Sequence, residues 1–321
     1  MPRRHVRLPL LAALLFSCAP LGLLAAGQPT TRPATQATQA TTQATQPTTQ
    51  VARPIQLGPI RVEEIYQTVD DQPIRGWAAK VDLTDPRVEI RVTGPIDRKP
   101  DDPPRLEARC ETTPAWLKHE KLTLAVNAHF FARLDDGKGP YPESCPVDLI
   151  GPCVSAGRVV SHGRDDGKAS PVLAFTKDGQ ARIAMLPPKE SEDLYNVVSG
   201  VSETGGKAGG LLVENGRNTG ATGLVAPTVR HPRTAAGLTK DGQTLILVVI
   251  DGRQRDWSIG VTLPELADIM LKLGADTAIA LDGGGSSSFV FAPPDAPQLT
   301  NRPSDGHWRP VGASLGVYVK P

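Results

Sequence analysis

Proline and glycine interrupt this chain throughout, and this constrains its fold more than any other feature of the sequence. The 31 prolines and 31 glycines are spread along the chain and divide it into short apolar, β-branched runs. Both residues disfavour helix interiors, so the pattern predicts many strands and few helices. Asp178-Gly179 and Asp241-Gly242 each stand between two such runs and are typical of hairpin turns. We therefore expect an α+β fold with a mixed β-sheet core.

One segment has the pattern of a helix. Thr262 and Glu265 have the spacing of a capping box, and a proline lies in the first turn. Apolar residues then recur at helical spacing, and Gly274 follows as a C-terminal stop. The recurring residues are Leu263, Leu266, Ala267 and Met270.

This helix lies between two continuously apolar runs, residues 244–250 and 277–281. Continuous runs are typical of strands that are buried on both faces. The order of strand, helix and strand predicts one parallel unit over residues 244–281, with a right-handed crossover. Asp251 and Asp282 follow the two runs, so we expect them side by side at the C-terminal edge of the sheet. Open α/β sheets bind ligands at that edge.

Asp282 begins the stretch DGGGSSS (282–288). Three consecutive glycines cost about 2–3 kcal/mol relative to alanine, so we expect a compensating role. Successive glycine N–H groups can form an anion-binding concavity. The stretch does not fit the serine elbow GxSxG, a Walker loop or the dinucleotide pattern GxGxxG.

The first 27 residues have the pattern of an export signal. Arg3, Arg4 and Arg7 precede an apolar stretch over residues 8–26, and small residues stand at 25–27. Two alternatives are a retained membrane anchor and a lipoprotein anchored through Cys18. We expect an exported protein that is periplasmic, on the cell surface or extracellular, without a stable membrane span.

Residues 28–53 are rich in Thr and Gln and contain no large apolar cluster, which predicts a disordered linker. Residues 54–321 are long enough for one sizeable domain. Without residues 1–27, 32 basic and 34 acidic residues remain. This balance does not favour nucleic-acid binding through gross charge, and we expect no nucleic-acid partner.

Three cysteines remain beyond the export signal: Cys110, Cys145 and Cys153. Cys145 and Cys153 flank a turn-rich segment and are the pair that we expect to form a disulfide in an oxidising compartment. The alternative is three buried thiols. Their spacing matches no zinc-binding pattern.

Two further stretches carry polar residues next to apolar runs. In LAVNAHFF (124–131), Asn127 and His129 follow a buried strand, and a single histidine there is more often a packing residue than a catalyst. In RHPRTAAGL (230–238), Arg230, His231 and Arg233 precede a strand. Arginine forks bind phosphate or carboxylate, and the alternative is a solvated basic turn.

The ordered motifs of residues 229–290 resemble the phosphodiester glycosidase family. The motifs are PRTAAG, DGR, TLPELA and LDGGGS. NAHFF (127–131) is similar to the family's Asn-Gly-Gly-Phe-Phe stretch, and GGLLVENGR (209–217) is similar to its glycine-led strand. The likeness covers roughly residues 75–320.

The resemblance implies a catalytic domain over residues 54–321 of a secreted hydrolase that acts on sugar 1-phosphodiesters. It would cleave the anomeric C–O bond and release free sugar and a phosphomonoester. The resemblance implies Asp251 and Asp282 as catalytic residues, and which of them is nucleophile or base stays open. The substrate- and phosphate-binding residues that it implies are Asn127, Arg233, Arg253, Ser258, Gly284 and Ser286. We predict no cofactor, leave a divalent cation open, and expect a sugar-phosphate or glycan substrate as the partner.

Three positions depart from the family's pattern. Ala128 and His129 stand in place of the paired glycines, and Ala280 stands in place of an asparagine. These departures bear on substrate identity more than on reaction type. Two other functions stay open. One is a non-catalytic envelope module that binds glycan or a phosphate-containing polymer. The other is a metal-dependent phosphodiesterase that cleaves P–O, with the metal between the two aspartates.

Overall fold

The structure, a computed structural model, describes residues 54–163, 168–200, 210–220, 226–294 and 297–321. All of these belong to one unit of the chain, residues 46–321. The predicted export signal (1–27) and the predicted linker (28–53) lie outside the described residues. Within the described ranges, no helix is both long and apolar enough to cross a membrane.

The described residues form four β-sheets. The large sheet has the strand order β1 (Ile55–Leu57), β2 (Ile60–Val69), β3 (Gln72–Asp82), β17 (Thr244–Ile250), β16 (Arg233–Leu238), β18 (Thr277–Ala280), β14 (Val213–Glu214), β15 (Arg217–Asn218). The central sheet has the order β20 (Leu299–Thr300), β19 (Phe289–Phe291), β6 (Leu124–Asn127), β21 (Ser314–Val319), β4 (Val88–Val92). The outer sheet has the order β10 (Arg158–His162), β9 (Pro152–Ser155), β13 (Asn196–Ser199), β11 (Ser170–Phe175), β12 (Ala181–Leu186). The small sheet has the order β5 (Ala108–Arg109), β8 (Pro146–Leu149), β7 (Phe131–Arg133).

Helices are few in the part of the chain that the structure describes: α1 (Thr113–His119), α2 (Pro188–Glu192), α3 (Leu263–Lys272) and the 3-10 turn η1 (Gly284–Ser286). The predicted capping box of α3 is confirmed, because Thr262 Oγ1 accepts from the Glu265 N–H at 3.3 Å and Glu265 Oε2 accepts from the Thr262 N–H at 2.9 Å. The four apolar residues predicted for this helix are buried. Gly274 follows the helix with φ +99°, which confirms the predicted stop.

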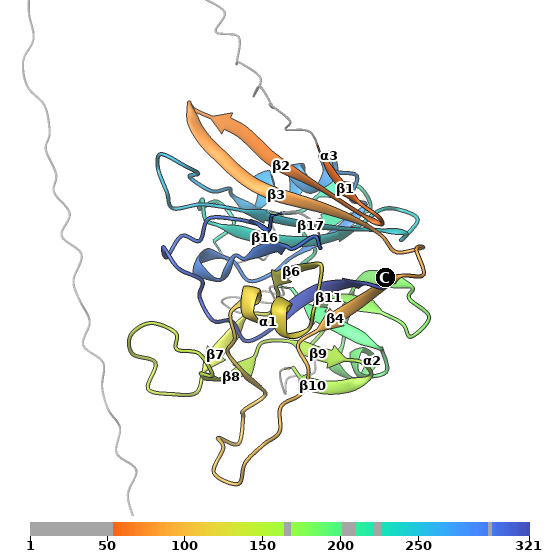
Figure 1. Cartoon of the computed structure of the whole chain (residues 1–321), viewed down its shortest axis with the longest axis vertical. Helices are drawn as coiled ribbons and strands as arrows, with labels where there is room; N and C mark the ends of the chain where they lie inside the picture. Colours follow the sequence, from red (N-terminus) through yellow and green to blue (C-terminus); the bar gives the residue numbers. More distant parts are fainter. Residues whose placement is uncertain (1–53, 164–167, 201–209, 221–225, 295–296) are drawn as a thin grey trace, which may run out of the picture. The chain divides into compact units, whose positions relative to one another are not determined.

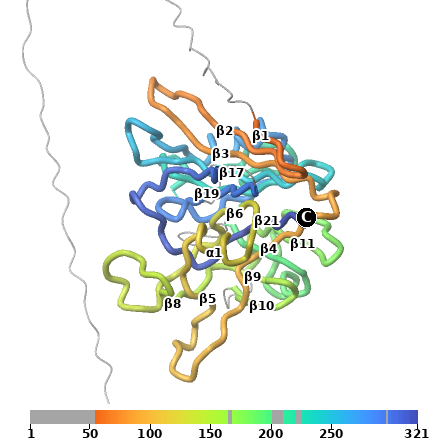
Figure 2. The backbone as a smooth tube through the Cα atoms, in the orientation of Figure 1, coloured from red at the N-terminus to blue at the C-terminus, as the bar shows by residue number. Residues whose placement is uncertain are grey.

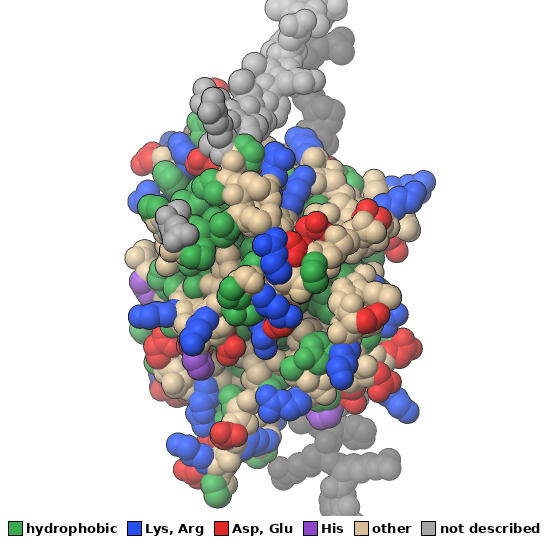
Figure 3. All heavy atoms as spheres, turned by 45° about the vertical axis from the view of Figure 1, so that its right-hand side comes forward, with side chains coloured by type: hydrophobic (Ala, Val, Ile, Leu, Met, Phe, Trp, Pro, Cys, Tyr) green, Lys and Arg blue, Asp and Glu red, His purple; other side chains and the backbone are tan. Residues whose placement is uncertain are grey.

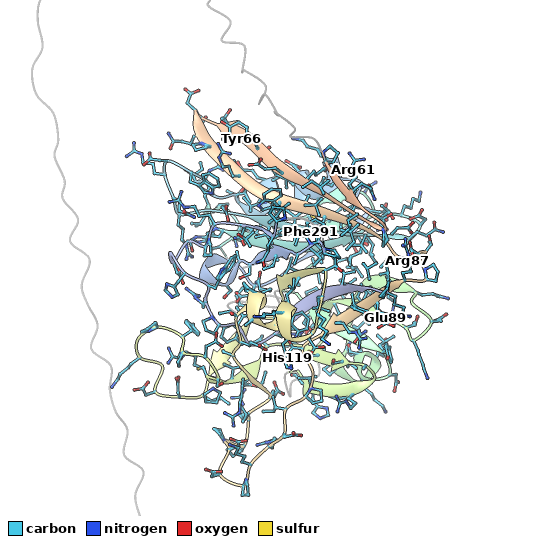
Figure 4. All side chains as sticks on the ribbon, viewed as in Figure 1. Arg61, Tyr66, Arg87, Glu89, His119 and Phe291 are labelled. Atoms are coloured by element: carbon cyan, nitrogen blue, oxygen red, sulfur yellow. The ribbon has the colours of Figure 1, made fainter. Side chains whose placement is uncertain are left out.

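The large sheet is covered on both faces. One face packs against α3, where Ala78, Val248 and Ala280 belong to the same apolar cluster as Leu266 and Met270. The other face belongs to a larger cluster that it shares with the central and outer sheets. Figures 1 and 2 show the central strands β6, β19 and β21 between the large sheet and the strands β8, β9 and β10. Phe291, which Figure 4 labels, lies inside this second cluster.

Both predicted hairpin turns are confirmed. Gly179 (φ +87°) lies between β11 and β12, and Gly242 (φ +69°) lies between β16 and β17. The sequence reasoning missed the longest hairpin, β2–β3, whose register runs from Ile60 opposite Val81 to Val69 opposite Gln72.

The predicted α+β fold with a mixed β-sheet core is wrong, and so is the predicted parallel unit over residues 244–281. Every strand pair in the described residues is antiparallel. Strand β16 lies between β17 and β18 and pairs antiparallel with both. The apolar runs arise because both faces of an antiparallel sheet are covered, a situation that a sequence run cannot distinguish from parallel pairing. Since β17 and β18 both oppose β16, they still point in the same direction.

The predicted Cys145–Cys153 disulfide is not formed, and the three cysteines carry free thiols. Continuing the β5–β8 register places Cys110 opposite Cys145, and the Cys110 N–H donates to the Cys145 carbonyl at 2.9 Å. Burial raises the pKa of the Cys110 thiol, and the Cys145 thiol beside it raises it further. Cys153 is fully buried in the core between the sheets.

Candidate active site

The turn after β18 contains the three glycines, and two of them are held against the segment before β16. A Cβ atom on Gly283 would lie 2.8 Å from the carbonyl oxygen of Pro232. Gly284 has φ +63°, and a Cβ there would lie 3.1 Å from a guanidinium nitrogen of Arg253. The Gly284 N–H donates to the Pro232 carbonyl at 2.9 Å. These glycines therefore allow close packing, and the expected N–H concavity is partly closed by hydrogen bonds within the chain.

The third glycine lies against an ion pair that the sequence reasoning did not include. A Cβ atom on Gly285 would collide with Arg309 and Asp305. Arg309 donates from Nη2 and Nε to Asp305 Oδ2 at 2.6 and 3.0 Å. Its guanidinium carbon also lies 4.8 Å from the centre of the Tyr141 ring. The Arg309–Asp305 ion pair therefore lies against the turn at Gly285, and the Arg253 guanidinium lies against the turn at Gly284.

Asp282 lies at the start of this turn, and its side chain is almost fully buried. The residue is 9% exposed. The N–H of Gly283 donates to its Oδ1 at 2.9 Å. Burial raises the pKa of the Asp282 carboxyl to about 7, an effect partly offset by the Ser286 hydroxyl, the Gly283 N–H and the charge of Arg309. A carboxyl group with such a pKa can change protonation state near neutral pH, which suits acid–base or nucleophilic chemistry.

Asp251 follows β17, and its carboxylate is saturated by hydrogen bonds. Trp257 Nε1 and Asn301 Nδ2 each donate to it at 2.8 Å. The N–H of Arg302 donates to both of its oxygens at 3.1 Å. Burial raises the pKa of the Asp251 carboxyl, and the hydrogen bonds oppose that rise. Asp251 therefore holds the segment after β20 and the loop after β17 together.

The indole that binds Asp251 also lies close to two arginines. The guanidinium carbon of Arg75 lies 4.5 Å from the centre of the Trp257 ring, and that of Arg302 lies 5.5 Å from it. Ser258 is fully buried beside them, where its Oγ donates to the Asp251 carbonyl at 2.7 Å and accepts from the Arg75 N–H at 3.0 Å. The predicted site residue Ser258 is thus joined to Asp251 through backbone contacts.

Asn127 lies fully buried beneath the turn. Its Nδ2 donates to the Asp282 carbonyl at 2.6 Å. Its Oδ1 accepts from Thr234 Oγ1 at 2.7 Å and from the Ser288 N–H at 3.0 Å. These bonds join the ends of β6, β16 and the glycine turn, so the side chain of Asn127 positions Asp282.

A cluster of cationic side chains, Arg233 and Arg253 with His231 beside them, lies next to the turn. Arg233 is 9% exposed, and its Nη2 donates to the carbonyls of Ala226 and Val229 at 2.9 Å each. Burial, and then the charge of Arg253, lower the pKa of Arg233 to about 10. Within the residues that the structure describes, neither arginine forms an ion pair with a carboxylate. The cluster therefore has uncompensated positive charge, which suits an anionic ligand.

The two aspartates do not form a carboxylate pair. Strand β16 separates the strands that precede them, and the charge that acts on Asp282 comes from Arg309. Asp251 instead lies against Trp257, Asn301 and Arg302. The expectation that both carboxylates face one cleft side by side rested on the parallel unit, which the structure does not contain.

Comparisons with known proteins assign this chain to a family. A sequence profile of the phosphodiester glycosidases matches residues 120–318. The chain belongs to the phosphodiester glycosidase family. Over 198 residues it is 29% identical to N-acetylglucosamine-1-phosphodiester alpha-N-acetylglucosaminidase of Bos taurus, a match that covers 58% of this chain and 34% of the bovine protein. Over 89 residues it is 44% identical to the SPbeta prophage-derived uncharacterized protein YomE of Bacillus subtilis, covering 28% of this chain and 13% of that protein.

The match thus spans about a third of the bovine relative's length. The fold is also similar to that of a zebrafish protein, the N-acetylglucosamine-1-phosphodiester alpha-N-acetylglucosaminidase catalytic domain auto-inhibited by its pro-peptide. That similarity has a TM-score of 0.55 and 22% sequence identity, and it covers 87% of this chain and 86% of the zebrafish chain. At this identity the likeness establishes the fold alone.

The positions that depart from the phosphodiester glycosidase pattern lie in the interior. Ala128, His129 and Ala280 are all buried. His129 Nε2 accepts from the Ser199 N–H at 3.2 Å, and its Nδ1 has no hydrogen-bond partner among the residues that the structure describes. Burial lowers the pKa of His129 to about 4. Its ring therefore lies wholly in the interior of the protein.

A cavity of about 850 Å³ lies elsewhere in this family member, between the small and outer sheets. Glu107 and Asp148 are among the residues that line it. Burial raises the pKa of Glu107 to about 7, and the Asp148 carboxylate beside it raises it further. None of the motifs that identify the family contributes to this cavity. Among the described residues, no group of three or more His, Cys, Asp or Glu side chains is arranged to hold a metal ion.

Proposed function

We propose that this chain hydrolyses sugar 1-phosphodiesters at the anomeric C–O bond and releases free sugar and a phosphomonoester. One observation carries the proposal. The uncompensated charge of Arg233 and Arg253 lies beside a turn whose first residue, Asp282, has a carboxyl pKa of about 7. Family membership supports a sugar-phosphodiester hydrolase, and the bovine relative is named for that class of substrate.

The cationic cluster would bind the phosphate. A phosphate monoester leaves with its negative charge and needs little help from a general acid, whereas stabilising that charge matters strongly. The Arg253 guanidinium is exposed and lies against Gly284, where no side chain separates it from the turn. Arg233 is held by backbone carbonyls, and its guanidinium adds a second positive charge close to that of Arg253.

We propose that Asp282 is the residue that acts at the anomeric carbon of the substrate. Its carboxylate would stabilise the oxocarbenium-like centre, either by forming a glycosyl bond or by activating water. In the overall reaction, the oxygen of water forms a bond to C1, the C1–O bond breaks, and the phosphate keeps the bridging oxygen. We assign Asp251 and Asn127 to positioning, because their polar atoms are bonded within the chain.

A screen of sugar 1-phosphodiesters in oxygen-18 water tests this proposal. The label should appear on the anomeric hydroxyl of the released sugar and be absent from the phosphomonoester. Label in the phosphate would contradict C–O cleavage and favour a phosphodiesterase. The same assay with a chelator tests for a divalent cation. If wild type and Asp282→Asn both bind a sugar 1-phosphodiester tightly and neither hydrolyses it, the result would favour the non-catalytic envelope binding module.

We also propose that the chain is exported, on the strength of the charged, apolar and small-residue pattern of residues 1–27. Expression of the full chain in a bacterium, followed by the intact mass of the processed protein, tests this. Cleavage near residue 27 supports an export signal. A lipid-modified N-terminal Cys18 would instead support the lipoprotein, and an unprocessed chain in the cytoplasm would contradict export.

A further inference from the structure

His231 lies directly before β16, and its backbone is tightly held. Its N–H donates to the Val261 carbonyl at 3.2 Å, and its carbonyl accepts from the Val261 N–H at 3.1 Å. Two glycines pack against it: a Cβ on Gly260 would lie 2.5 Å from the His231 carbonyl oxygen, and one on Gly252 would lie 2.9 Å from its carbonyl carbon. The imidazole therefore extends from a fixed point beside the glycine turn.

The side chain of His231 is bonded to Arg253. The Nε and Nη2 atoms of Arg253 lie 3.4 and 3.3 Å from His231 Nδ1. A guanidinium has donors and no acceptor, so Nδ1 must be the accepting nitrogen. The neutral ring then carries its proton on Nε2. Arg253 adopts this position with φ +61°, a left-handed backbone conformation that is uncommon outside glycine and is often retained at functional sites.

The charged groups that face this imidazole are both cations. Arg233 comes from β16 and Arg253 from the loop after β17, and Val261, which packs against the backbone, is uncharged. Burial, together with the charges of Arg233 and Arg253, lowers the pKa of His231. The ring is therefore neutral at neutral pH, although it stands beside positive charge that has no carboxylate partner among the described residues. It is a hydrogen-bond donor of fixed direction within an anion site.

We propose that His231 contacts the phosphate group of the substrate and donates its Nε2–H to a phosphoryl oxygen as a neutral imidazole whose tautomer is set by Arg253. This rests on the proposed function. His231 would add to the charge of the two arginines a hydrogen-bond donor that stays neutral when the phosphate group binds. Arginine forks supply charge, and the imidazole supplies direction, so His231 would determine how the phosphodiester is oriented relative to Asp282.

Sulfate binding to the full chain tests this without turnover, because sulfate is a dianion that does not titrate near neutral pH. His231→Gln keeps an N–H donor near the Nε2 position, whereas the shorter amide of His231→Asn can place its oxygen near Nδ1 but has no donor that reaches the Nε2 position. We expect His231→Asn to weaken sulfate binding by about tenfold or more, the scale of a hydrogen bond to a charged group, and His231→Gln to restore most of it. His162→Gln, a change at an exposed histidine outside the site, is the matched control. Equal affinity in wild type and His231→Asn would overturn the proposal.

The pH dependence and the tautomer separate a neutral donor from an imidazolium. Asp282 also titrates near pH 7, so this measurement uses Asp282→Asn, which lacks that carboxyl. Its affinity for sulfate should stay constant between about pH 7 and 8, because the pKa of His231 lies below its ordinary value of 6.5. Affinity that rises as pH falls through this range would show that the imidazolium binds, and would overturn the proposal. Nitrogen-15 spectra of wild type should show His231 protonated on Nε2 alone, and Arg253→Lys should release it to a mixture of tautomers. A wild-type Nδ1–H tautomer would contradict the proposal even if the histidine variants do not fold.

The outcomes also separate this inference from the proposed function. If the chain hydrolyses sugar 1-phosphodiesters and His231→Asn binds sulfate as well as wild type does, only the role of His231 fails. If sulfate binding and the spectra behave as expected and no sugar phosphodiester is hydrolysed, only the proposed reaction fails.

Discussion

Asp251 and Asp282 occupy matching places in the large sheet and differ in what their carboxylates do. Both follow strands that point in the same direction, β17 and β18. Asp251 accepts from an indole, an amide and a backbone N–H, whereas the hydrogen bond that Asp282 Oδ1 accepts comes from the N–H of the next residue. The comparison shows that two carboxylates at matching strand ends can have different numbers of internal donors. Asp282 keeps more lone pairs free for a ligand than Asp251 does.

The largest expected effect distinguishes the two residues by activity. Asp282→Asn should lower kcat/KM for a sugar 1-phosphodiester by at least about a thousandfold, because the group assigned to the anomeric centre is lost. The fold should be preserved, since the amide replaces a buried carboxyl that is partly protonated at neutral pH. Steady-state kinetics and far-ultraviolet circular dichroism measure both. Near-normal turnover in this variant would contradict the role of Asp282.

Asp251→Asn should act mainly on stability. The amide nitrogen that replaces one oxygen cannot accept from Trp257, Asn301 or Arg302, so at least one buried donor loses its partner. We expect the free energy of unfolding to fall by about 2–3 kcal/mol, measured by urea denaturation. A variant as stable as wild type with a thousandfold loss of kcat would reverse the roles that we assign to the two aspartates.

The pH dependence of stability should depend on Asp282. Its pKa is about 7 in the folded chain and near the ordinary value of 3.8 when unfolded. Between these values the folded chain keeps a proton that the unfolded chain has released, so stability from this group falls as pH rises from about 4 to 7. Asp282→Asn should flatten this part of the profile, measured by urea denaturation at pH 5 and pH 7. An unchanged slope would show that Asp282 is ionised throughout.

The smallest expected effect comes from Ser286, which lies 1% exposed within the turn. Its hydroxyl lowers the pKa of Asp282, so Ser286→Ala should raise that pKa. The midpoint in the pH profile of kcat/KM that reports Asp282 should move up by less than about one unit. Ser304→Ala, which alters a hydroxyl paired with Asp305, is the matched control. A downward shift would contradict the contact between Ser286 and Asp282.

Local features of the fold were predictable because the atoms that produce them are close in the sequence. The capping box of α3 requires only Thr262 and Glu265, and the hairpin turns require only a glycine that can adopt positive φ. The β2–β3 hairpin was missed because its turn is Asp70-Asp71, with φ +50° and +58°. Aspartate tolerates that conformation, but it is a weaker signal than Asp-Gly.

Contacts between distant segments were not predictable in the same way. Asn301 and Arg309, which bind Asp251 and flank the glycine turn, lie outside every motif that identified the family. His231 was noted as part of a basic segment, yet its contact with Arg253 depends on how β16 and the loop after β17 meet. No motif spacing in the sequence predicts the contact between His231 and Arg253.

The sequence by itself determined the family, the strand-rich composition and the helix α3, because short motifs and local turns carry that information. Only the tertiary structure decided that β16 lies between β17 and β18, and that distant segments donate to Asp251 while the donors to Asp282 come from its own turn. The physical reason is that burial on both faces produces the same apolar run for parallel and antiparallel strands. The role of a carboxylate likewise depends on which distant donors reach it, and only the packed sheets bring those donors together.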